Sequence, residues 1–490
     1  MKLKVKNVNM STGGPLVAVN NKDDAARLDV HALDRVTLTV KNKTLVVLVN
    51  ISNHGIQPGV IGLFTEVLNR LNVKDGEHLI AIPHARPLSA WSIKKKLDGK
   101  TLTKEEIVTI VKDFTTNSLT SIDLTYFISA VYTKGMNLHE TAWLTEALVE
   151  YGGHLSIKRK MLLDKHCIGG VAGNRTTMVV VPIIAAAGYP MIKTSSRSIT
   201  SPAGTADTME VFAPVTHSKE KINTIMKQTN ACMIWGGTFE LASADDAIIT
   251  LERILFLDPR GMLLASILAK KKAVGATHVI IDIPLGRGAK VKHKNQALQL
   301  ARQFTALGKI LHMHIKCVIT DGSQPVGNGV GPVLEARDVL SVLSGNGPAD
   351  LRMKSLKLAT ELLRMAGAKN PAALAEDMLT SGKALEKFRD IIKAQGGKKH
   401  IHIGDLLPGK YTSSVTATKA ARITHIDNSR LSKAARIAGA PTDKKAGIYL
   451  HVKKGTQVKN GQLLYTVYAE HPKKLEFALD YIKREPFMEY

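Results

Sequence analysis

The sequence has few cysteine residues, and their spacing excludes two kinds of architecture. Cys167, Cys232 and Cys317 are the three cysteines in 490 residues, and no two of them form a Cys-x-x-Cys pair. A disulfide framework needs a denser paired set, and a zinc ribbon needs closely spaced pairs of ligands. We therefore expect no disulfide scaffold, no metal centre, and a protein that works in a reducing compartment.

Long hydrophobic runs are also missing. The longest nearly continuous apolar run covers residues 178–188 and is interrupted by Pro182. A membrane-spanning helix needs about 20 apolar residues. The first residues, MKLKVKNVNMSTGG, lack the apolar segment of a signal peptide. The sequence therefore predicts a soluble cytoplasmic protein with no membrane partner, in which the apolar run is buried in an α/β core.

Acidic and aromatic residues are both scarce. Lysine and arginine total 67 against 42 aspartates and glutamates, so the net charge is +25, and aromatic residues make up 5% of the chain. A strongly basic chain suits either nucleic acid or small anionic substrates. Single-strand binding uses basic residues interleaved with aromatic ones, and the sequence lacks that pattern. Nucleic acid is therefore not expected as the main partner.

What the chain does contain is a succession of β-rich and helical segments. Residues 36–40 and 44–49 read as strands joined by a turn, and a helix is expected to start after Thr103. Further on, residues 279–281 suit a buried strand and residues 296–307 suit a helix. The sequence predicts an α/β protein with four domains: a β-rich N-terminal domain at 1–85, a small helical domain at 86–158, a large α/β domain at 159–405 with a mixed, largely parallel sheet and a helical later part, and a β-rich α+β C-terminal module at 406–490.

The densest functional pattern is DKHCIGGVAGNRTT, which starts at Asp164. Glycines such as Gly169 and Gly170 let the backbone approach a ligand closely and direct N–H groups at an anion. Lys165 and Arg175 add positive charge, which suits phosphate. The spacing is not that of a P-loop. An ordinary glycine-rich turn is the alternative.

A second pattern, KTSSRSITSPAGTAD, starts at Lys193 and is dominated by hydroxyl side chains, with Arg197 among them. It precedes a helix that we expect to begin near Thr205 or Asp207. Hydroxyl groups, a guanidinium and a helix N-terminus together favour binding of an anion and a sugar. The alternative is a solvated loop that caps the helix.

Two further segments place polar residues beside apolar elements. In DPRGMLLASILAK, Asp258 and Pro259 fit the cap and the first residue of a helix, and Ser266 and Lys270 lie four residues apart on one face of it. In IDIPLGRGAK, a strand runs into a basic glycine-rich loop that ends at Lys290. Both segments are candidate ligand contacts. A structural cap and a solvated basic turn are the alternatives.

The motifs DKHCIGGVAGNRTT, KTSSRSITSPAGTADTMEVF and LASILAKK, in this order, closely resemble the thymidine phosphorylase family. The chain is most similar to the long branch that contains AMP phosphorylase and the type 2 thymidine phosphorylases, which carry an additional N-terminal domain. The resemblance covers essentially the whole chain. It implies a nucleoside phosphorylase fold, domain closure over the substrates, and a homodimer or higher homo-oligomer.

The resemblance also assigns roles to individual residues. Positions that hold phosphate match Lys165, Ser195 and Thr205, and positions near the base match His166, Ser266 and Lys270. Nucleotide-binding positions of the AMP phosphorylase branch match Gly170, Ser196, Arg197, Ser198, Ile199, Thr200, Ser201, Thr205, Ser266 and Lys290. Asp258 matches the proposed proton donor, and His166 is the second catalytic candidate.

Two positions depart from the family pattern. Cys167 stands where classical members carry a phosphate-binding serine, which puts one hydroxyl contact in doubt. Leu251 stands where they carry an arginine that contacts the pyrimidine, which puts thymine specificity in doubt.

Taken together, the residues and the resemblance predict a pentosyltransferase. Phosphate, as co-substrate, attacks C1′ of the sugar while the base departs, and no cofactor or metal is required. The leading prediction is conversion of thymidine and phosphate to thymine and 2-deoxyribose 1-phosphate. The alternative substrate is AMP or another nucleoside 5′-monophosphate, which gives free base and ribose 1,5-bisphosphate. A third hypothesis is a non-catalytic basic protein that binds nucleic acid.

Overall fold

The structure is a computed structural model that describes residues 1–155, 157, 159–198, 201–239, 243–252, 254 and 257–490. The chain divides into two compact units: the first comprises Met1–Gly152 and Ala242–Ser266, and the second comprises Gly153–Leu241 and Ile267–Tyr490. No helix in the described ranges is both long enough and apolar enough to cross a membrane.

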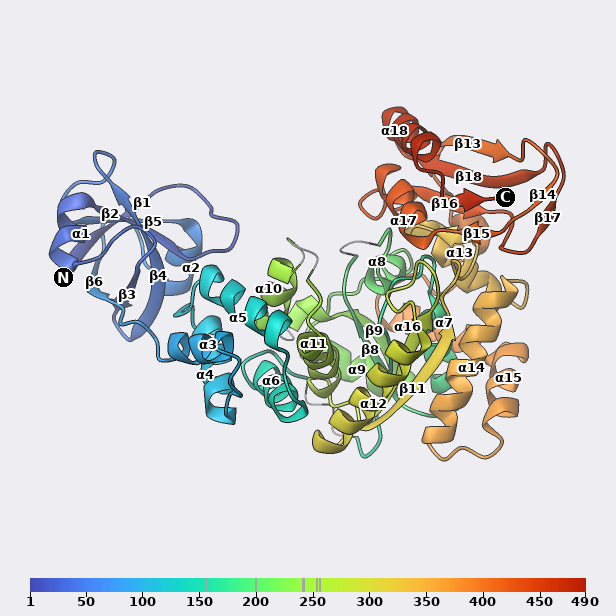
Figure 1. The fold of residues 1–490 in the computed structure, drawn as a ribbon, viewed down its shortest axis with the longest axis horizontal. Helices are drawn as coiled ribbons and strands as arrows, with labels where there is room; N and C mark the ends of the chain where they lie inside the picture. The colour runs from blue at the N-terminus through green and yellow to red at the C-terminus, as the bar shows by residue number, and fades with distance from the viewer. Residues whose placement is uncertain (156, 158, 199–200, 240–242, 253, 255–256) are drawn as a thin grey trace. The chain divides into compact units, whose positions relative to one another are not determined.

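The first unit begins with a closed barrel in the strand order β1-β5-β2-β4-β3-β6 (Figure 1). Its elements are β1 (Lys2–Asn7), β2 (Val17–Asn21), α1 (Lys22–Leu28), β3 (Arg35–Val40), β4 (Lys43–Ser52), β5 (Val60–Leu63), α2 (Thr65–Leu71) and β6 (His78–Pro83). Val36, Leu38 and Val40 alternate with half-exposed residues along β3, so the strand faces the barrel core with every second side chain. The predicted turn between β3 and β4 is confirmed by their antiparallel pairing.

Helices form the rest of the first unit: α3 (Ser89–Leu97), α4 (Lys104–Thr115), α5 (Ser121–Lys134), α6 (Leu138–Glu150) and α10 (Ser243–Glu252). The predicted start of a helix after Thr103 is confirmed. Thr103 accepts from the backbone of Glu106, and the Glu106 carboxylate accepts from the backbone of Thr103. This reciprocal capping satisfies two donors that a helix start otherwise leaves unpaired.

A parallel sheet with the order β11-β10-β7-β8-β9 is the centre of the second unit. Its strands are β7 (Leu163–Cys167), β8 (Met191–Ser195), β9 (Ala231–Trp235), β10 (His278–Leu285) and β11 (His314–Asp321). The sequence predicted a mixed, largely parallel sheet, and every pairing between these five strands is parallel. The order in which strands are added reverses between β7 and β10. After β7 the chain adds β8 and β9 on one side of it, and then returns to add β10 and β11 on the other side.

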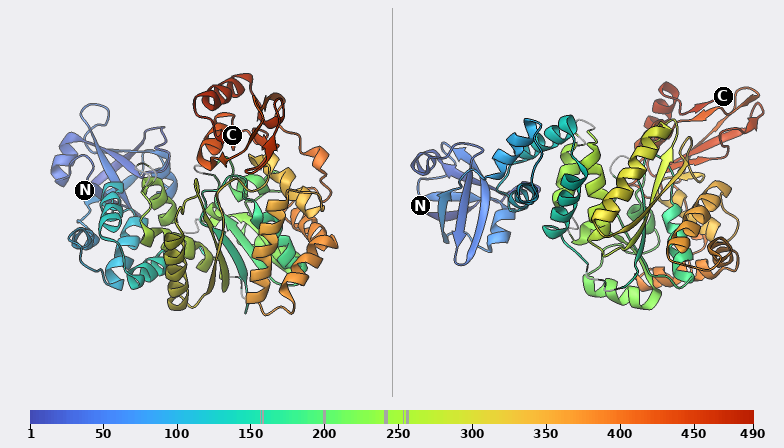
Figure 2. Two further views of the ribbon diagram at one scale, coloured as in Figure 1. Left: turned by 45° about the vertical axis from the view of Figure 1, so that its right-hand side comes forward. Right: turned by 60° about the horizontal axis from the view of Figure 1, so that its bottom comes forward.

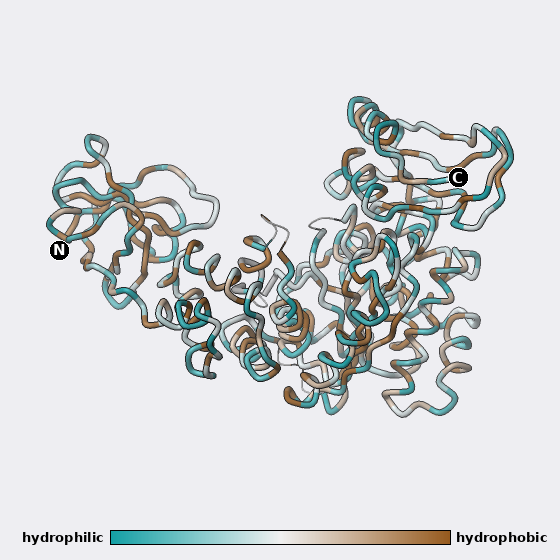
Figure 3. The backbone as a smooth tube through the Cα atoms, viewed as in Figure 1, coloured by the Kyte–Doolittle hydropathy of each residue, from teal (hydrophilic) through white to brown (hydrophobic). Residues whose placement is uncertain are grey.

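Helices cover both faces of this sheet (Figure 2). They are α7 (Thr176–Ala186), α8 (Thr205–Met209), α9 (Lys219–Thr229), α12 (Lys294–Ile310), α13 (Pro332–Leu343), α14 (Ala349–Met365), α15 (Pro371–Thr380) and α16 (Lys383–Ala394). The predicted strand at 279–281 and helix at 296–307 fall within β10 and α12 and are confirmed. The apolar run that starts at Met178 lies in helix α7, which is buried along almost its whole length within one of the hydrophobic clusters of the chain. Figure 3 shows hydrophobic stretches in the barrel, around the parallel sheet and in the C-terminal part.

The C-terminal part of the second unit contains a four-stranded sheet in the order β12-β16-β18-β13. Its strands are β13 (Tyr411–Thr416), β16 (Gly447–Leu450), β18 (Leu463–Ala469) and, from earlier in the chain, β12 (Gly329–Val330). Two short pairs, β14 (Ala421–Arg422) with β17 (Gln457–Val458) and β15 (His425–Ile426) with β19 (Met488–Glu489), and two helices, α17 (Asn428–Ile437) and α18 (Pro472–Arg484), complete it. The four domain boundaries proposed from the sequence stay a prediction.

Helix α11 (Arg260–Lys272) corrects one detail of the sequence prediction. Pro259 was expected at the first helical position, but the helix begins at Arg260, and the Pro259 carbonyl accepts from the backbone of Leu263. Pro259 therefore occupies the capping position that was expected for Asp258. Ser266 and Lys270 both lie on α11, four residues apart as predicted.

Candidate active site

Two of the predicted segments meet at the point where the strand order of the sheet reverses, between β7 and β10. The glycine-rich loop follows β7, and the loop that ends at Lys290 follows the neighbouring strand β10. A side-chain carbon at Gly170 would lie 2.4 Å from the backbone nitrogen of Lys290, and φ of Gly170 is +86°, so this contact requires glycine. Parallel α/β sheets bind ligands in the crevice at such a reversal.

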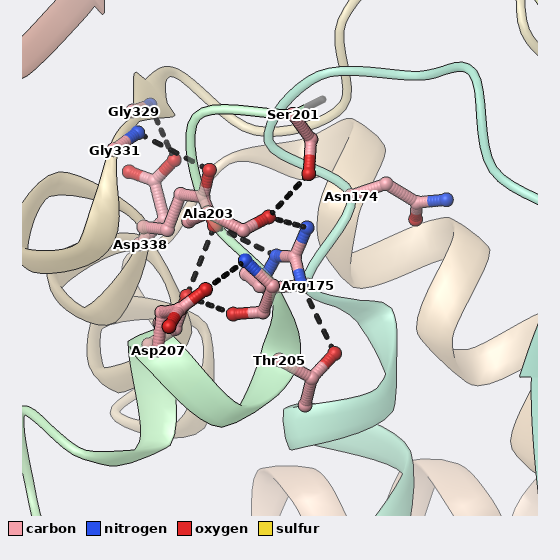
Figure 4. A network of polar contacts seen from close by, with 12 residues as sticks. Asn174, Arg175, Ser201, Ala203, Thr205, Asp207, Gly329, Gly331 and Asp338 are labelled. Atoms are coloured by element: carbon pink, nitrogen blue, oxygen red, sulfur yellow. Dashed lines mark hydrogen bonds and ion pairs between the residues drawn. The ribbon is translucent and has the colours of Figure 1, made fainter. Parts of the chain in front are cut away.

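The glycine-rich loop also contacts the hydroxyl-rich segment, through Arg175 (Figure 4). The Arg175 guanidinium donates to the hydroxyl of Thr205 at 3.0 Å and to the carbonyl of Ala203 at 3.2 Å. Its Nε lies 2.7 Å from a carboxylate oxygen of Glu335 on α13. The two segments to which the resemblance assigns phosphate contacts are therefore joined directly.

The Asp207 side chain holds the hydroxyl-rich segment by binding the backbone of that segment. The Asp207 carboxylate accepts from the backbone of Ser198 at 2.7 Å and of Gly204 at 2.8 Å. The Ser201 hydroxyl donates to the carbonyl of Ala203 at 3.0 Å. Helix α8 begins at Thr205, as predicted, but it has only five residues, so its contribution to anion binding as a dipole is small.

Arg197 is directed at carboxylates within the same segment. Its two terminal nitrogens each donate to Glu210 at 2.8 Å, one of them also lies 3.4 Å from Asp207, and the guanidinium lies 5.0 Å from the centre of the Trp235 ring. The hydrogen bond to Glu210 raises the pKa of Arg197. These bonds hold the loop on which Ser196 and Ser198 lie, and the nucleotide contact that the resemblance assigns to Arg197 stays a prediction.

Lys165 is buried rather than exposed at the loop surface. Its ammonium group donates to the hydroxyl of Thr176 at 2.9 Å and to that of Thr177 at 3.3 Å. Burial lowers the pKa of Lys165, and Asp282, at 3.7 Å, opposes that change. The Lys165 ammonium group therefore contacts two threonine hydroxyls and lies near a carboxylate in the protein interior.

Asp282 is shared by two lysines and one hydroxyl. Lys354 of α14 lies 3.3 Å from the carboxylate, Lys165 lies nearest to the same oxygen, and Thr320 donates to the other oxygen at 2.6 Å. Burial alone would raise the pKa of Asp282, but Lys165 and Lys354 together bring it below its usual value. The aspartate is thus held ionised in the protein interior.

A second buried carboxylate, Asp164, lies 2.6 Å from Lys271 and 3.9 Å from Lys193. Burial and then Lys271 bring the pKa of Lys193 well below its usual range. Around the start of the glycine-rich loop, four lysines thus accompany two aspartates, Asp164 and Asp282. Lysine side chains therefore gather at the start of the loop that the family resemblance assigns to phosphate.

His166 lies beside this cluster. Burial and then the ammonium groups of Lys271 and Lys193 hold the pKa of His166 well below its usual range. The imidazole is therefore neutral near pH 7. Cys167, the next residue, accepts a hydrogen bond from Asn174 at 3.2 Å, and burial raises its pKa, so a neutral thiol occupies the position of the family serine.

The other predicted site residues are distributed as follows. The Ser195 hydroxyl, at the end of β8, donates to the carbonyl of Ile234 at 3.3 Å. Within the second unit, Ser196 and Lys290 are exposed, and Gly169 and Lys270 are half-buried. In the first unit, Asp258 is exposed and the Ser266 hydroxyl donates to Asp245 at 2.8 Å. Ile199 and Thr200 lie outside the described residues.

Sequence reasoning missed the buried charged residues that hold this region together. Glu335, Asp207, Lys354 and Asp282 did not appear among the candidates. One signal was available for Asp282, because it interrupts the apolar strand sequence IIDIPL and a buried charge there needs a partner. Glu335 carried no such signal, since its partner Arg175 lies far away in the sequence.

Family models match three stretches of the chain. They are the helical bundle domain of a glycosyl transferase family at residues 92–152, the a/b domain of a glycosyl transferase family at residues 159–385, and the pyrimidine nucleoside phosphorylase C-terminal domain at residues 422–486. With the parallel sheet and the loops at its carboxyl edge, these matches define a pentosyltransferase of the nucleoside phosphorylase class.

Curated relatives match over nearly the whole chain. AMP phosphorylase from Natronomonas pharaonis is 44% identical over 487 residues, covering 98% of this chain and 96% of the relative. AMP phosphorylase from Thermococcus kodakarensis is 44% identical over 488 residues, covering 99% and 97%. A candidate thymidine phosphorylase from Legionella pneumophila is 41% identical over 456 residues, covering 92% and 87%. The chain therefore belongs to the thymidine phosphorylase family, in the long branch that contains AMP phosphorylase.

A solved structure shows the same fold at greater distance. Anthranilate phosphoribosyltransferase from Thermus thermophilus has a TM-score of 0.52 at 18% identity, and the match covers 63% of this chain and 99% of that one. The relatives named AMP phosphorylase favour the alternative substrate over the leading prediction of thymidine. A homodimer and a cytoplasmic location stay predictions from the sequence.

Proposed function

We propose that this enzyme performs the phosphorolysis of AMP, which releases adenine and forms ribose 1,5-bisphosphate. Relatives named AMP phosphorylase, at 44% identity over nearly the whole chain, support this substrate. The absence of the pyrimidine-contacting arginine at Leu251 points the same way. The observation that carries the proposal is the meeting of three loops at the sheet reversal, where Gly170 lies against Lys290 and Arg175 binds Thr205.

Inorganic phosphate is proposed to bind at the glycine-rich loop. The backbone at Gly169 and Gly170 and the hydroxyls of Ser195 and Thr205 provide hydrogen-bond donors. Lys165 contributes positive charge through Thr176 and Thr177, to which its ammonium donates. Donors fixed before binding hold the phosphate in line with C1′ and stabilise the charge that develops as the bond to the base breaks.

The 5′-phosphate of AMP is assigned to Lys290. This lysine is exposed and its backbone touches Gly170, so its side chain can reach an anion outside the inorganic phosphate position. The described residues of the hydroxyl-rich segment, Ser196, Ser198 and Ser201, are assigned to the same nucleotide.

Asp258 is assigned as the donor of the proton to the departing base. A general acid gives its proton to the departing base, and Asp258 matches the position of the proton donor proposed for the family. His166, Ser266 and Lys270 are assigned to hydrogen bonds with the base. We expect Asp258→Asn to lower kcat by about 100-fold with little change in the KM for phosphate. Unchanged turnover in a correctly folded variant would remove this assignment.

The substrate is tested by measuring the release of free base from AMP, CMP, uridine and thymidine, each with and without inorganic phosphate. We expect phosphate-dependent release that is fastest by kcat/KM with AMP. Faster turnover of thymidine would overturn the choice of substrate, whereas the lack of any phosphate-dependent release would overturn the enzyme itself.

The role of Lys290 is tested by Lys290→Gln with Lys292→Gln as the matched control, since both lysines are exposed and two residues apart. Loss of one charge-assisted contact raises the KM for AMP by about tenfold. The KM for adenosine, which lacks the 5′-phosphate, should not change in either variant. Equal effects of the two substitutions on AMP would contradict a specific contact.

A further inference from the structure

Arg175 is held by protein groups at each of its three nitrogens. Its side chain is 10% exposed and that of Glu335 is fully buried, and its Nε lies 2.7 Å from a carboxylate oxygen of Glu335. The remaining nitrogens donate to Thr205 and to the carbonyl of Ala203. Figure 4 shows the Arg175 guanidinium beside Thr205 and Ala203. Protein groups therefore fix the orientation of the guanidinium.

The bond to Thr205 has a chemical consequence. A guanidinium only donates hydrogen bonds, so the Thr205 oxygen must accept, and its own hydrogen points elsewhere. Across the ranges that the structure describes, that hydrogen has no acceptor, and the side chain is half-buried at the start of α8. A hydroxyl in this state is a ready donor to a phosphate oxygen.

Glu335 holds the arginine in place. Besides Arg175, its carboxylate accepts from the Thr208 hydroxyl at 3.1 Å and from the backbone of Gly331 at 3.2 Å. Each partner lies on a different part of the second unit: the glycine-rich loop, α8 and the start of α13. The carboxylate thus sets the position of the guanidinium relative to the hydroxyl-rich segment.

We propose that Arg175 is a positioning residue that, held by Glu335, fixes the Thr205 hydroxyl as a hydrogen-bond donor to inorganic phosphate. It raises phosphate affinity through Thr205 and does not touch the anion. The proposal rests on the proposed function, because Thr205 is there assigned to phosphate. The charge of Arg175 suggests direct contact with phosphate, whereas the proposal gives Arg175 an indirect role.

A double-mutant cycle tests this route. Removal of Arg175 alone would leave Glu335 buried without a partner, so both are changed together as Arg175→Met with Glu335→Gln. Thr205→Val removes the hydroxyl with little change of shape. The affinity for inorganic phosphate alone is measured by equilibrium dialysis, and the KM for phosphate is measured in turnover.

Each change is expected to weaken phosphate binding by about tenfold. If Arg175 acts through Thr205, the protein that carries both changes should also bind phosphate only about tenfold more weakly than the wild type. The second change then removes no further contact with phosphate. A multiplied effect of about 100-fold would show independent contacts and overturn the proposal. So would unchanged phosphate affinity after removal of the Arg175–Glu335 pair.

Controls separate this outcome from general damage. Arg337→Met removes an arginine of α13, the helix of Glu335, that donates to the carbonyls of Leu406 at 2.9 Å and Ile403 at 3.4 Å, and should leave phosphate affinity unchanged. Thr205→Ser, which keeps the hydroxyl, should restore most of the affinity lost in Thr205→Val. Dialysis measures the binding of phosphate alone, without AMP. If the effects of the two changes on phosphate affinity are not additive but the enzyme does not turn over AMP, the proposed function is rejected and the role of Arg175 is kept.

Discussion

The barrel of the first unit and the carboxyl edge of the sheet in the second unit are both well buried, but they are built from different material. The barrel core consists of apolar side chains such as Leu3, Leu38 and Ile61, which are completely buried. Near the sheet edge the buried side chains include Lys165, Asp282 and Glu335. Burial therefore serves cohesion in one region and charge placement in the other.

The energetic rules differ accordingly. An apolar barrel gains stability in proportion to the surface it removes from water. A buried ion costs several kcal/mol unless a partner compensates it, so each charge at the sheet edge is retained only with its partners. Four lysines share two aspartates there. Burial lowers the pKa of Lys165 and of Lys193, which reduces the cost of keeping these side chains in the interior.

The largest expected effect is the removal of a compensating charge at the sheet edge. Asp282→Leu leaves Lys165 and Lys354 buried without their shared carboxylate and should lower the free energy of unfolding by about 3–5 kcal/mol. Asp377→Leu is the control, because Asp377 forms an exposed ion pair with Lys383 at 3.2 Å, and it should cost less than about 1 kcal/mol. Urea denaturation measures the free energy of unfolding of both variants. Similar losses in the two would contradict the claim that the buried carboxylate is more important for stability than the exposed one.

In the barrel the matching change is the truncation of an apolar side chain. Leu38→Ala removes a fully buried side chain and should lower the free energy of unfolding by about 2–5 kcal/mol. Ile82→Ala, at a position that is 48% exposed, should cost about 1 kcal/mol or less. The KM for phosphate should stay within about twofold in both variants. A large rise in that KM would show that the barrel supports the site.

Two glycines with similar backbone angles separate strain from contact. Gly170 has φ +86° and would place a side-chain carbon against Lys290, whereas Gly59 of the barrel has φ +79° and nothing within 4 Å. Alanine at either position costs about 1 kcal/mol of strain. Only Gly170→Ala should also displace a loop, raising the KM for AMP by about tenfold. Equal kinetics of the two variants would mean that the close approach has no role.

The smallest expected effect concerns pH. Because the folded protein lowers the pKa of His166 below its ordinary value of 6.5, the unfolded chain binds a proton below that pH while the folded one does not. The free energy of unfolding should therefore fall as pH drops below 6.5, by up to about 1.4 kcal/mol per pH unit. In His166→Gln this contribution is lost. The free energy of unfolding, measured by denaturation at several pH values, should therefore change less with pH than in the wild type between the ordinary and the lowered pKa of His166.

Local patterns predicted much of the fold. The start of α4 after Thr103, the hairpin of β3 and β4, and the parallel sheet all depend on neighbours in sequence or on strand alternation, which a sequence displays directly. The short length of α8 was not predicted, and the start of α11 differs from the prediction. At α8 the Asp207 carboxylate accepts from the backbone of Gly204 and also from that of Ser198, nine residues earlier, which the local helix-start pattern does not reveal.

The assignment of individual site residues stays a prediction. The resemblance assigns residues of both the glycine-rich and the hydroxyl-rich segments to phosphate, and Arg175 joins these two segments. Arg197, which the resemblance assigns to the nucleotide, binds Glu210, and no local pattern reveals which acid such a side chain will meet. Lys165 is buried for the same reason, because its partner Asp282 comes from another strand.

Strand β12 has a consequence for inherited or engineered truncations. These two residues pair with β16 and so tie the end of the chain to the turn that precedes α13, the helix of Glu335. A premature stop codon before β16 would leave β12 without its neighbour and would uncover the remaining apolar residues of that cluster, such as Val330 and Ala172. Unpaired strand edges promote aggregation. Such a shortened chain should accumulate as insoluble material rather than as a smaller working enzyme.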